Sequence, residues 1–188
     1  MNLLFAYTYR EDDLAGLPLS ELAAFTLESE ELPAATEVSV SFVDNDEIAR
    51  LNAEFRHKAG PTDVLSFECD LDEDEDDPAF ASGPIVELGD VIIAPDVAEA
   101  QTALYGTTFE QEISLLLVHG LLHLCGYDHV EDGEARIMQA RERDILGEWF
   151  ARRGMDAEAQ AEPIAYEPFS VAARVTAESA LPKTPEER

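Results

Sequence analysis

The chain contains one strongly apolar segment, Phe109-Glu-Gln-Glu-Ile-Ser-Leu-Leu-Leu-Val-His-Gly-Leu-Leu-His-Leu124. A helix that is apolar around most of its circumference must be covered by other elements on all sides. Thr108 and Gln111 match the capping-box pattern at its start, and Gly126 can adopt the left-handed conformation that closes a helix. We therefore predict that residues 109–124 form the buried central helix of a domain.

Four shorter segments have the alternation or the β-branched composition that is typical of strands. They lie at residues 3–9, 37–43, 63–67 and 88–94. Helical spacing is found over residues 17–27, 45–55, 95–105 and 132–152 as well as in the central segment. Strands and helices that alternate around one buried helix predict a single α+β domain, with a small mixed sheet packed by about five helices.

The charge of the chain is strongly negative. Its 188 residues include 41 Asp and Glu against 12 Lys and Arg, for a formal net charge of -29 at pH 7. This balance excludes a basic protein that coats nucleic acid, while 46% hydrophobic residues suffice for one core. No lysine or arginine lies between Lys58 and Arg136, so much of the negative charge falls in the middle of the chain.

The densest acidic run extends from Glu68 to Asp77. Such runs repel themselves and are usually solvated, so we predict a flexible insertion at about residues 68–83. A calcium site is the alternative, but the run lacks the glycine and the terminal glutamate of an EF-hand loop. Residues 1–154 are predicted to form the domain, and residues 155–188, with several prolines and no periodicity, a mostly disordered tail.

The first residues, the length of the apolar stretches and the two cysteines indicate the cellular compartment of the protein. The first residues lack the basic start of a signal peptide, and no apolar stretch reaches the ~20 residues of a membrane-spanning helix. We therefore expect a cytoplasmic protein in which Cys69 and Cys125 are reduced thiols.

Three of the four histidines, His119, His123 and His129, lie close together in the sequence. On a helix, His119 and His123 are one turn apart on the same face, and a chain reversal at Gly126 would bring His129 to the same point. Three neutral nitrogen ligands with a fourth position open for water form a catalytic type of zinc site, although imidazoles also bind nickel or copper. The alternative is that all three are hydrogen-bonded polar residues beside a core helix.

The spacing of the histidines matches that of the metzincin proteases, His-Glu-x-x-His-x-x-Gly-x-x-His, except that position 120 is glycine. Without the glutamate that acts as general base, a peptidase of that mechanism is not supported. Tyr127 and Asp128 either orient an imidazole or form only local hydrogen bonds in the turn. Cys125 lies about 200° around the helix from His123, so it should face the core.

Two basic residues, Arg56 and Lys58, lie in the predicted loop between a helix and a strand. A guanidinium binds phosphate oxygens bidentately and stabilises the charge that develops during phosphoryl transfer. The alternative is a surface salt bridge to one of the many acidic residues. His57, between them, is interpreted as an ordinary loop histidine.

The segment His119-Gly-Leu-Leu-His-Leu-Cys-Gly-Tyr-Asp-His129 resembles the signature of the YbeY family, bacterial ribosomal-RNA maturation factors described as zinc-dependent single-strand endoribonucleases. Residues 51–67 resemble the arginine-bearing motif of that family, and residues 88–93 resemble its central strand. The resemblance covers about residues 1–150, whereas the acidic insertion and the tail depart from the family pattern.

The resemblance implies an α+β fold with a four-stranded mixed sheet, one zinc ion per chain on His119, His123 and His129, and an active-site arginine at Arg56. The residues expected to be catalytic are Arg56 and His119. It also implies single-stranded RNA as substrate, maturation of the small-subunit RNA 3′ end, and ribosome quality control. The expected partner is the ribosome or its small subunit, bound directly or through a basic ribosomal protein, and neither DNA nor membranes are expected.

The resulting hypothesis is metal-assisted phosphodiester cleavage, in which zinc activates a water molecule or polarises a phosphate oxygen while Arg56 stabilises the developing charge. The attacking group is either water or an internal 2′-hydroxyl, and no residue is assigned as general base. Two rivals stay open: a zinc hydrolase of another bond, and a non-catalytic ribosome assembly factor in which zinc is structural. The net charge of -29 opposes RNA affinity, so binding must be local or assisted by a basic partner.

Overall fold

The computed structural model describes residues 1–69 and 86–155 of the chain. The predicted acidic insertion at about residues 68–83 and the predicted tail at residues 155–188 lie almost entirely outside the described residues. Both stay predictions, as does the domain boundary at residue 154.

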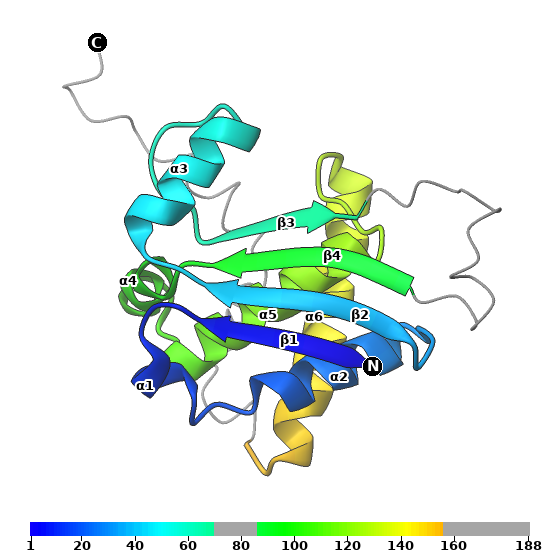
Figure 1. Cartoon of the computed structure of the whole chain (residues 1–188). Coiled ribbons are helices and arrows are strands. Elements are labelled where there is room, and N and C mark those ends of the chain that lie inside the picture. Colours follow the sequence, from blue (N-terminus) through cyan, green and yellow to red (C-terminus); the bar gives the residue numbers. More distant parts are fainter. Residues whose placement is uncertain (70–85, 156–188) are drawn as a thin grey trace, which may run out of the picture.

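The centre of the fold is a mixed sheet of four strands (Figure 1). β1 (Asn2–Tyr7) pairs in parallel with β2 (Thr36–Phe42), which pairs in parallel with β4 (Val86–Ile93). β3 (Val64–Glu68) pairs antiparallel with β4 and forms one edge of the sheet, in the order β1-β2-β4-β3. The expected four-stranded mixed sheet is confirmed.

Six helices occur in the described part of the chain, where about five were expected. The additional helix, α1, has 4 residues, which is too short to show helical periodicity in the sequence. None of the six is long and apolar enough to cross a membrane. They are α1 (Glu11–Leu14), α2 (Leu19–Ser29), α3 (Asn45–Phe55), α4 (Pro95–Tyr105), α5 (Phe109–Leu124) and α6 (Asp132–Arg152).

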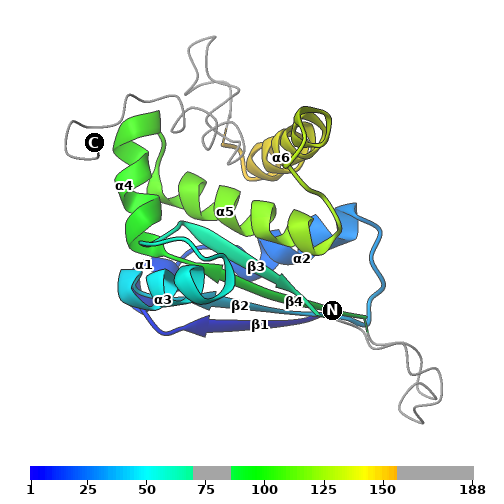
Figure 2. The ribbon, with the colours of Figure 1, turned by 90° about the horizontal axis from the view of Figure 1, so that it is seen from above.

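Helix α5 lies across one face of the sheet with α2 beside it, and α6 packs on the outer side of both (Figure 2). Every residue of α5 from Gln111 to Leu122 is buried. The side chains of Val40 on β2 and Val91 on β4 are fully buried in the same apolar cluster. The prediction of a buried central helix is therefore confirmed.

A smaller apolar cluster holds α3 against the edge strand β3. Ile48 and Leu51 of α3 pack there with Leu65, which points to the opposite face of the sheet from its neighbour Val64 because side chains alternate along a strand. The last turn of α3 and the loop after it therefore lie beside the free edge of the sheet.

Both ends of α5 are held by the local interactions that the sequence predicts. The Thr108 hydroxyl accepts a hydrogen bond from the Gln111 backbone N–H at 3.2 Å, and the Gln111 side-chain oxygen accepts one from the Thr108 N–H at 2.8 Å. At the other end Gly126 has a φ of 88°, and the Tyr127 N–H donates to the Leu122 carbonyl at 3.0 Å. The chain turns back at this point toward the helix it has just left.

Candidate metal centre

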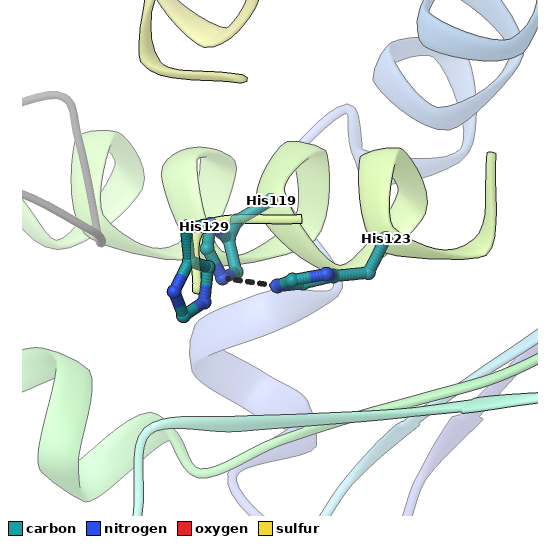
Figure 3. A group of neighbouring side chains, drawn as sticks. All are labelled: His119, His123 and His129. Carbon is teal, nitrogen blue, oxygen red and sulfur yellow. Dashed lines mark hydrogen bonds between the residues drawn. The ribbon is translucent and has the colours of Figure 1, made fainter. Parts of the chain in front are cut away.

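Three imidazoles converge near the end of α5 (Figure 3). His119 and His123 project from the same face of α5, and the turn at Gly126 returns His129 to them. One nitrogen of each ring lies within 4.8 Å of those of the other two, and the Nε2 atoms of His119 and His123 are 3.1 Å apart. His119 is buried, whereas His123 and His129 are partly exposed. These nitrogens could hold one metal ion that is accessible from one side.

Both α5 histidines use Nδ1 for a hydrogen bond to a group outside the cluster. Nδ1 of His123 donates to the backbone carbonyl of Tyr127 at 2.9 Å, and Nδ1 of His119 donates to Oε1 of Glu142 at 2.7 Å. A carbonyl and a carboxylate only accept, so each neutral ring carries its proton on Nδ1 and a lone pair on Nε2. Two lone pairs 3.1 Å apart repel each other unless a cation or a proton lies between them.

Burial disfavours protonation of the three imidazoles, so a proton between the two Nε2 atoms is unfavourable. Desolvation, together with the imidazoles of His119 and His129, lowers the pKa of His123 from 6.5 to about 4. Desolvation also lowers the pKa of His119 and that of His129. At neutral pH the three rings are therefore mainly in the neutral form, which is the form that binds a metal ion. The three histidines therefore fit a metal ion in two respects: their lone pairs converge, and their rings are neutral.

Glu142 is the residue of this site that the sequence analysis missed. It belongs to α6, and its side chain is completely buried. Met138 and Ile145, one turn before and one turn after it, are buried apolar residues on the same face of α6. The available signal was a glutamate on the apolar face of a helix, because a charged side chain is rarely buried without a partner.

Tyr127 and Asp128 do not orient an imidazole through their side chains. The Tyr127 hydroxyl donates to Glu30 at 3.0 Å, and only the Tyr127 backbone carbonyl meets His123. A carboxylate oxygen of Asp128 accepts from the backbone N–H of His129 at 2.6 Å. The alternative of a local hydrogen bond in the turn is therefore correct for Asp128, whereas the Tyr127 hydroxyl bonds to Glu30 at the end of α2, 97 positions away.

Packing excludes positions 120 and 125 from the chemistry of the site. A Cβ on Gly120 would lie 2.5 Å from Cγ1 of Val91, where α5 crosses β4, so the glutamate of the metzincin pattern has no room here. Cys125 packs against the main core, as predicted, and desolvation raises the pKa of its thiol to about 12. Cys125 is therefore a neutral thiol outside the histidine cluster.

An open groove of about 810 Å³ runs from the histidines past the edge strand β3 to the end of α3. Arg56 and Lys58 line this groove, so the basic loop and the three histidines belong to one site. His57 is exposed and does not line the groove, in agreement with its interpretation as an ordinary loop histidine.

Hydrogen bonds hold the loop that carries Arg56. The Arg56 N–H donates to the Asn52 carbonyl at 3.0 Å, and the Asn52 side chain donates to the Gly60 carbonyl at 2.9 Å. At the far end of the loop, the side chain of Gln101 on α4 donates to the Asp63 carboxylate at 3.0 Å. The backbone position of Arg56 is therefore determined by α3 and α4.

The salt-bridge alternative for Arg56 is not realised within residues 1–69 and 86–155. There, neither Arg56 nor Lys58 forms an ion pair, although five other arginines do. These are Arg10, Arg50, Arg141, Arg152 and Arg153. Within the described part of the chain, therefore, no acidic side chain neutralises the two basic groups of the groove, and both can face an anionic ligand.

The fold and the site together define a class. A three-histidine metal site that opens into a groove with two available basic side chains, on a small α+β fold, is the arrangement of a metal-dependent hydrolase. Comparison with known proteins identifies the family. The chain belongs to the YbeY family, since the family described as Endoribonuclease YbeY matches residues 12–149.

Individual relatives agree with this assignment. A protein named Endoribonuclease YbeY from Exiguobacterium sibiricum is 44% identical over 134 residues, which cover 71% of this chain and 85% of the relative. One of the same name from Geobacillus thermodenitrificans is 48% identical over 118 residues, 62% of this chain and 75% of the relative. The solution structure of TM1509 from Thermotoga maritima superposes with a TM-score of 0.56 at 26% identity, covering 86% of this chain and 97% of that one.

Proposed function

We propose that this chain is a zinc-dependent endoribonuclease that cleaves single-stranded RNA in the maturation of ribosomal RNA. The observation that carries the proposal is the convergence of three neutral imidazoles in the groove that Arg56 lines. Membership of the family described as Endoribonuclease YbeY supports the class of reaction. The proposal places the catalytic domain in residues 1–154 and the enzyme in the cytoplasm.

In this proposal His119, His123 and His129 hold the zinc ion. Three nitrogen ligands suit zinc, and the exposed side of the cluster leaves room for a further ligand. When bound, zinc supplies Lewis acidity toward a phosphate oxygen or a water molecule. Glu142 keeps the proton of His119 on Nδ1, so that Nε2 points its lone pair into the site. His119 therefore contributes to catalysis as the buried ligand.

Arg56 is the proposed catalytic residue that binds the scissile phosphate. Its guanidinium donates parallel hydrogen bonds to two phosphate oxygens, and Lys58 adds a second positive charge to the same groove. These bonds strengthen as negative charge grows on the phosphoryl oxygens in the transition state. The arrangement serves attack by water and attack by the 2′-hydroxyl of the RNA equally.

The proposed substrates are ribosomal RNAs, including the 3′ end of the small-subunit RNA, and the proposed partner is the ribosome or its small subunit. A net charge of -29 weakens attraction to RNA phosphates away from the groove. A basic ribosomal protein bound to the acidic surface would bring the enzyme to its RNA. Cleavage of exposed single strands in defective ribosomes would extend the same activity to quality control.

Cleavage of a single-stranded RNA by the full chain tests the proposal. Protein with one bound zinc ion is expected to cleave, whereas chelator-treated protein and His129→Ala are not. Arg56→Ala is expected to cleave about 100-fold more slowly, the usual loss when one transition-state donor is removed. The matched controls are His57→Asn and Arg50→Ala, a histidine and an arginine that do not line the groove, and both should cleave like the wild type.

The same assay separates the rivals. Equal cleavage in all samples would indicate a contaminating nuclease and would favour the non-catalytic assembly factor. Zinc-dependent hydrolysis of an ester with no cleavage of RNA would favour a hydrolase of another bond.

A further inference from the structure

Phe55 is an exposed aromatic side chain at the far end of the groove. It is the last residue of α3, it lines the groove, and 55% of its surface is exposed. Among the described residues, the other large apolar side chains that stand out into solvent are all aliphatic. They are Leu4, Leu104, Val130 and Ile137. An exposed apolar ring inside a groove is typical of a binding surface.

Phe67 of β3 supports the Phe55 ring. The two ring centroids are 5.0 Å apart and the ring planes are inclined at 68°, which is an edge-to-face contact. Phe67 itself is partly buried against the small apolar cluster beneath α3, and it also lines the groove. The orientation of Phe55 is therefore restrained on one side, while the rest of its surface is available to a ligand.

The chemistry beside Phe55 selects the ligand. Arg56 is the next residue in the chain and Lys58 follows closely, and neither forms an ion pair with a described residue. A ligand that occupies this end of the groove therefore meets a ring surface and a positive charge side by side. A nucleotide carries the matching pair of groups, a planar base and a phosphate.

We propose that Phe55 and Phe67 form a stacking subsite for one unpaired base of the RNA whose phosphate binds Arg56. This inference rests on the proposed endoribonuclease function and adds the element that selects single strands. In a duplex both faces of each base are covered by neighbouring bases, so no face is available to the ring. An unpaired base can leave the stack and lie on an aromatic side chain.

A stacking contact would also offset the weak electrostatic attraction between RNA and this groove. Asp63, Glu68 and Asp128 line it together with the two basic residues, and the whole chain is strongly negative. The phosphate contacts that dominate most RNA binding are therefore weakened here. A contact between a base and a ring does not depend on net charge, so it contributes a larger share of the affinity in this protein than in a basic one.

The test compares Phe55→Ala, Phe55→Leu and Phe55→Trp in the full chain, with affinity for a single-stranded RNA measured by fluorescence anisotropy and cleavage measured in parallel. Removing one stacking contact should weaken affinity and raise KM about 5- to 150-fold, with kcat at saturation unchanged. Phe55→Leu, which keeps apolar area without a π face, should lose nearly as much as Phe55→Ala, and Phe55→Trp should keep wild-type affinity. Leu104→Ala, an exposed apolar residue of α4 that does not line the groove, is the matched control and should change nothing.

A second arm changes the RNA instead of the protein. A set of RNAs, each with one abasic ribose, should contain one position that weakens binding of the wild type but not of Phe55→Ala. If Phe55→Ala or Phe55→Leu bound the RNA with wild-type affinity, the stacking subsite would be wrong. The exposed Phe55 ring would then be a candidate contact for a protein partner. Such a failure leaves wild-type cleavage intact, whereas failure of the proposed function removes RNA cleavage from the wild type and overturns both.

Discussion

Nδ1 of His119 lies 2.7 Å from Oε1 of Glu142, and both side chains are almost completely buried. The imidazole belongs to α5 and the carboxylate to α6, so the packing of these two helices places an acceptor behind the candidate metal ligand. A carboxylate in this position fixes the ring tautomer and makes Nε2 a better donor to a metal. Helix α6 therefore belongs to the site although it supplies no ligand.

Glu142→Gln is expected to weaken zinc binding without unfolding the protein. Glutamine keeps the shape and an acceptor oxygen but removes the negative charge, and outer partners of metal ligands typically contribute about 10–100-fold in affinity. Competition with a chromophoric chelator measures the effect. Glu148→Gln, an exposed position on the same helix, is the control and should bind zinc like the wild type. Unchanged affinity in Glu142→Gln would show that the hydrogen bond does not tune the metal site.

Gly120→Ala is expected to destabilise the protein through the contact with Val91. The added methyl would lie 2.5 Å from Cγ1 of Val91, and overpacking of this kind costs about 1–3 kcal/mol in the free energy of unfolding. Alanine recovers only ~1 kcal/mol through its better helix propensity. Urea denaturation measures the difference.

Two further variants make this experiment specific. Val91→Ala should lessen the cost of Gly120→Ala when the two are combined, because it removes the methyl group in the way. Gly147→Ala on α6, where an added Cβ has no neighbour within 4 Å, should stabilise the protein instead. If Gly120→Ala raised the free energy of unfolding as Gly147→Ala does, the tight contact between α5 and β4 at Gly120 would be contradicted.

The pKa of His123 predicts a pH dependence for the metal-free protein. Its pKa is 6.5 in the unfolded chain and about 4 in the fold, mainly because of desolvation, so the unfolded state binds more protons in between. The contribution of His123 to stability is therefore complete above pH 6.5 and is lost as the pH falls toward 4. The many carboxylates titrate nearby, so the quantity to measure is the difference in unfolding free energy between wild type and His123→Gln. As the pH falls from 6.5 toward 4, the wild type should lose unfolding free energy relative to His123→Gln. If the unfolding free energies of the two proteins changed in parallel with pH, the assigned pKa of His123 would be wrong.

The parts of this fold that the sequence predicted are those determined by local interactions. The buried helix follows from its own apolar composition, and its ends follow from Thr108, Gln111 and Gly126, which act within a few residues of their partners. The three histidines were recognised because two lie one helical turn apart and the third follows a predictable turn. The expected position of Cys125 follows from the same helical geometry.

The parts that were missed depend on packing between distant segments. Periodicity does not reveal that β4 lies between β2 and β3, which makes β3 an edge strand and opens the groove beside it. The partnership of Glu142 with His119 joins residues that are 23 positions apart, and the support of Phe55 by Phe67 depends on how α3 packs on the sheet. Charge and hydrophobicity patterns mark such residues as unusual without naming their partners.

Removal of zinc is expected to lower the thermal stability of the protein without unfolding it. The apolar core lies between α5, α2 and the sheet, and the histidines stand at one end of it, so the core is complete without the metal. A structural zinc site, by contrast, supplies the free energy that folds its domain. We expect the chelator-treated protein to keep its near-UV circular dichroism and a cooperative melt at a lower Tm, and added zinc to raise Tm by mass action. His129→Ala should melt near the chelator-treated wild type and should not respond to zinc. A metal-free chain without cooperative melting would favour the assembly factor with structural zinc over the enzyme, because the ion would then hold the fold together.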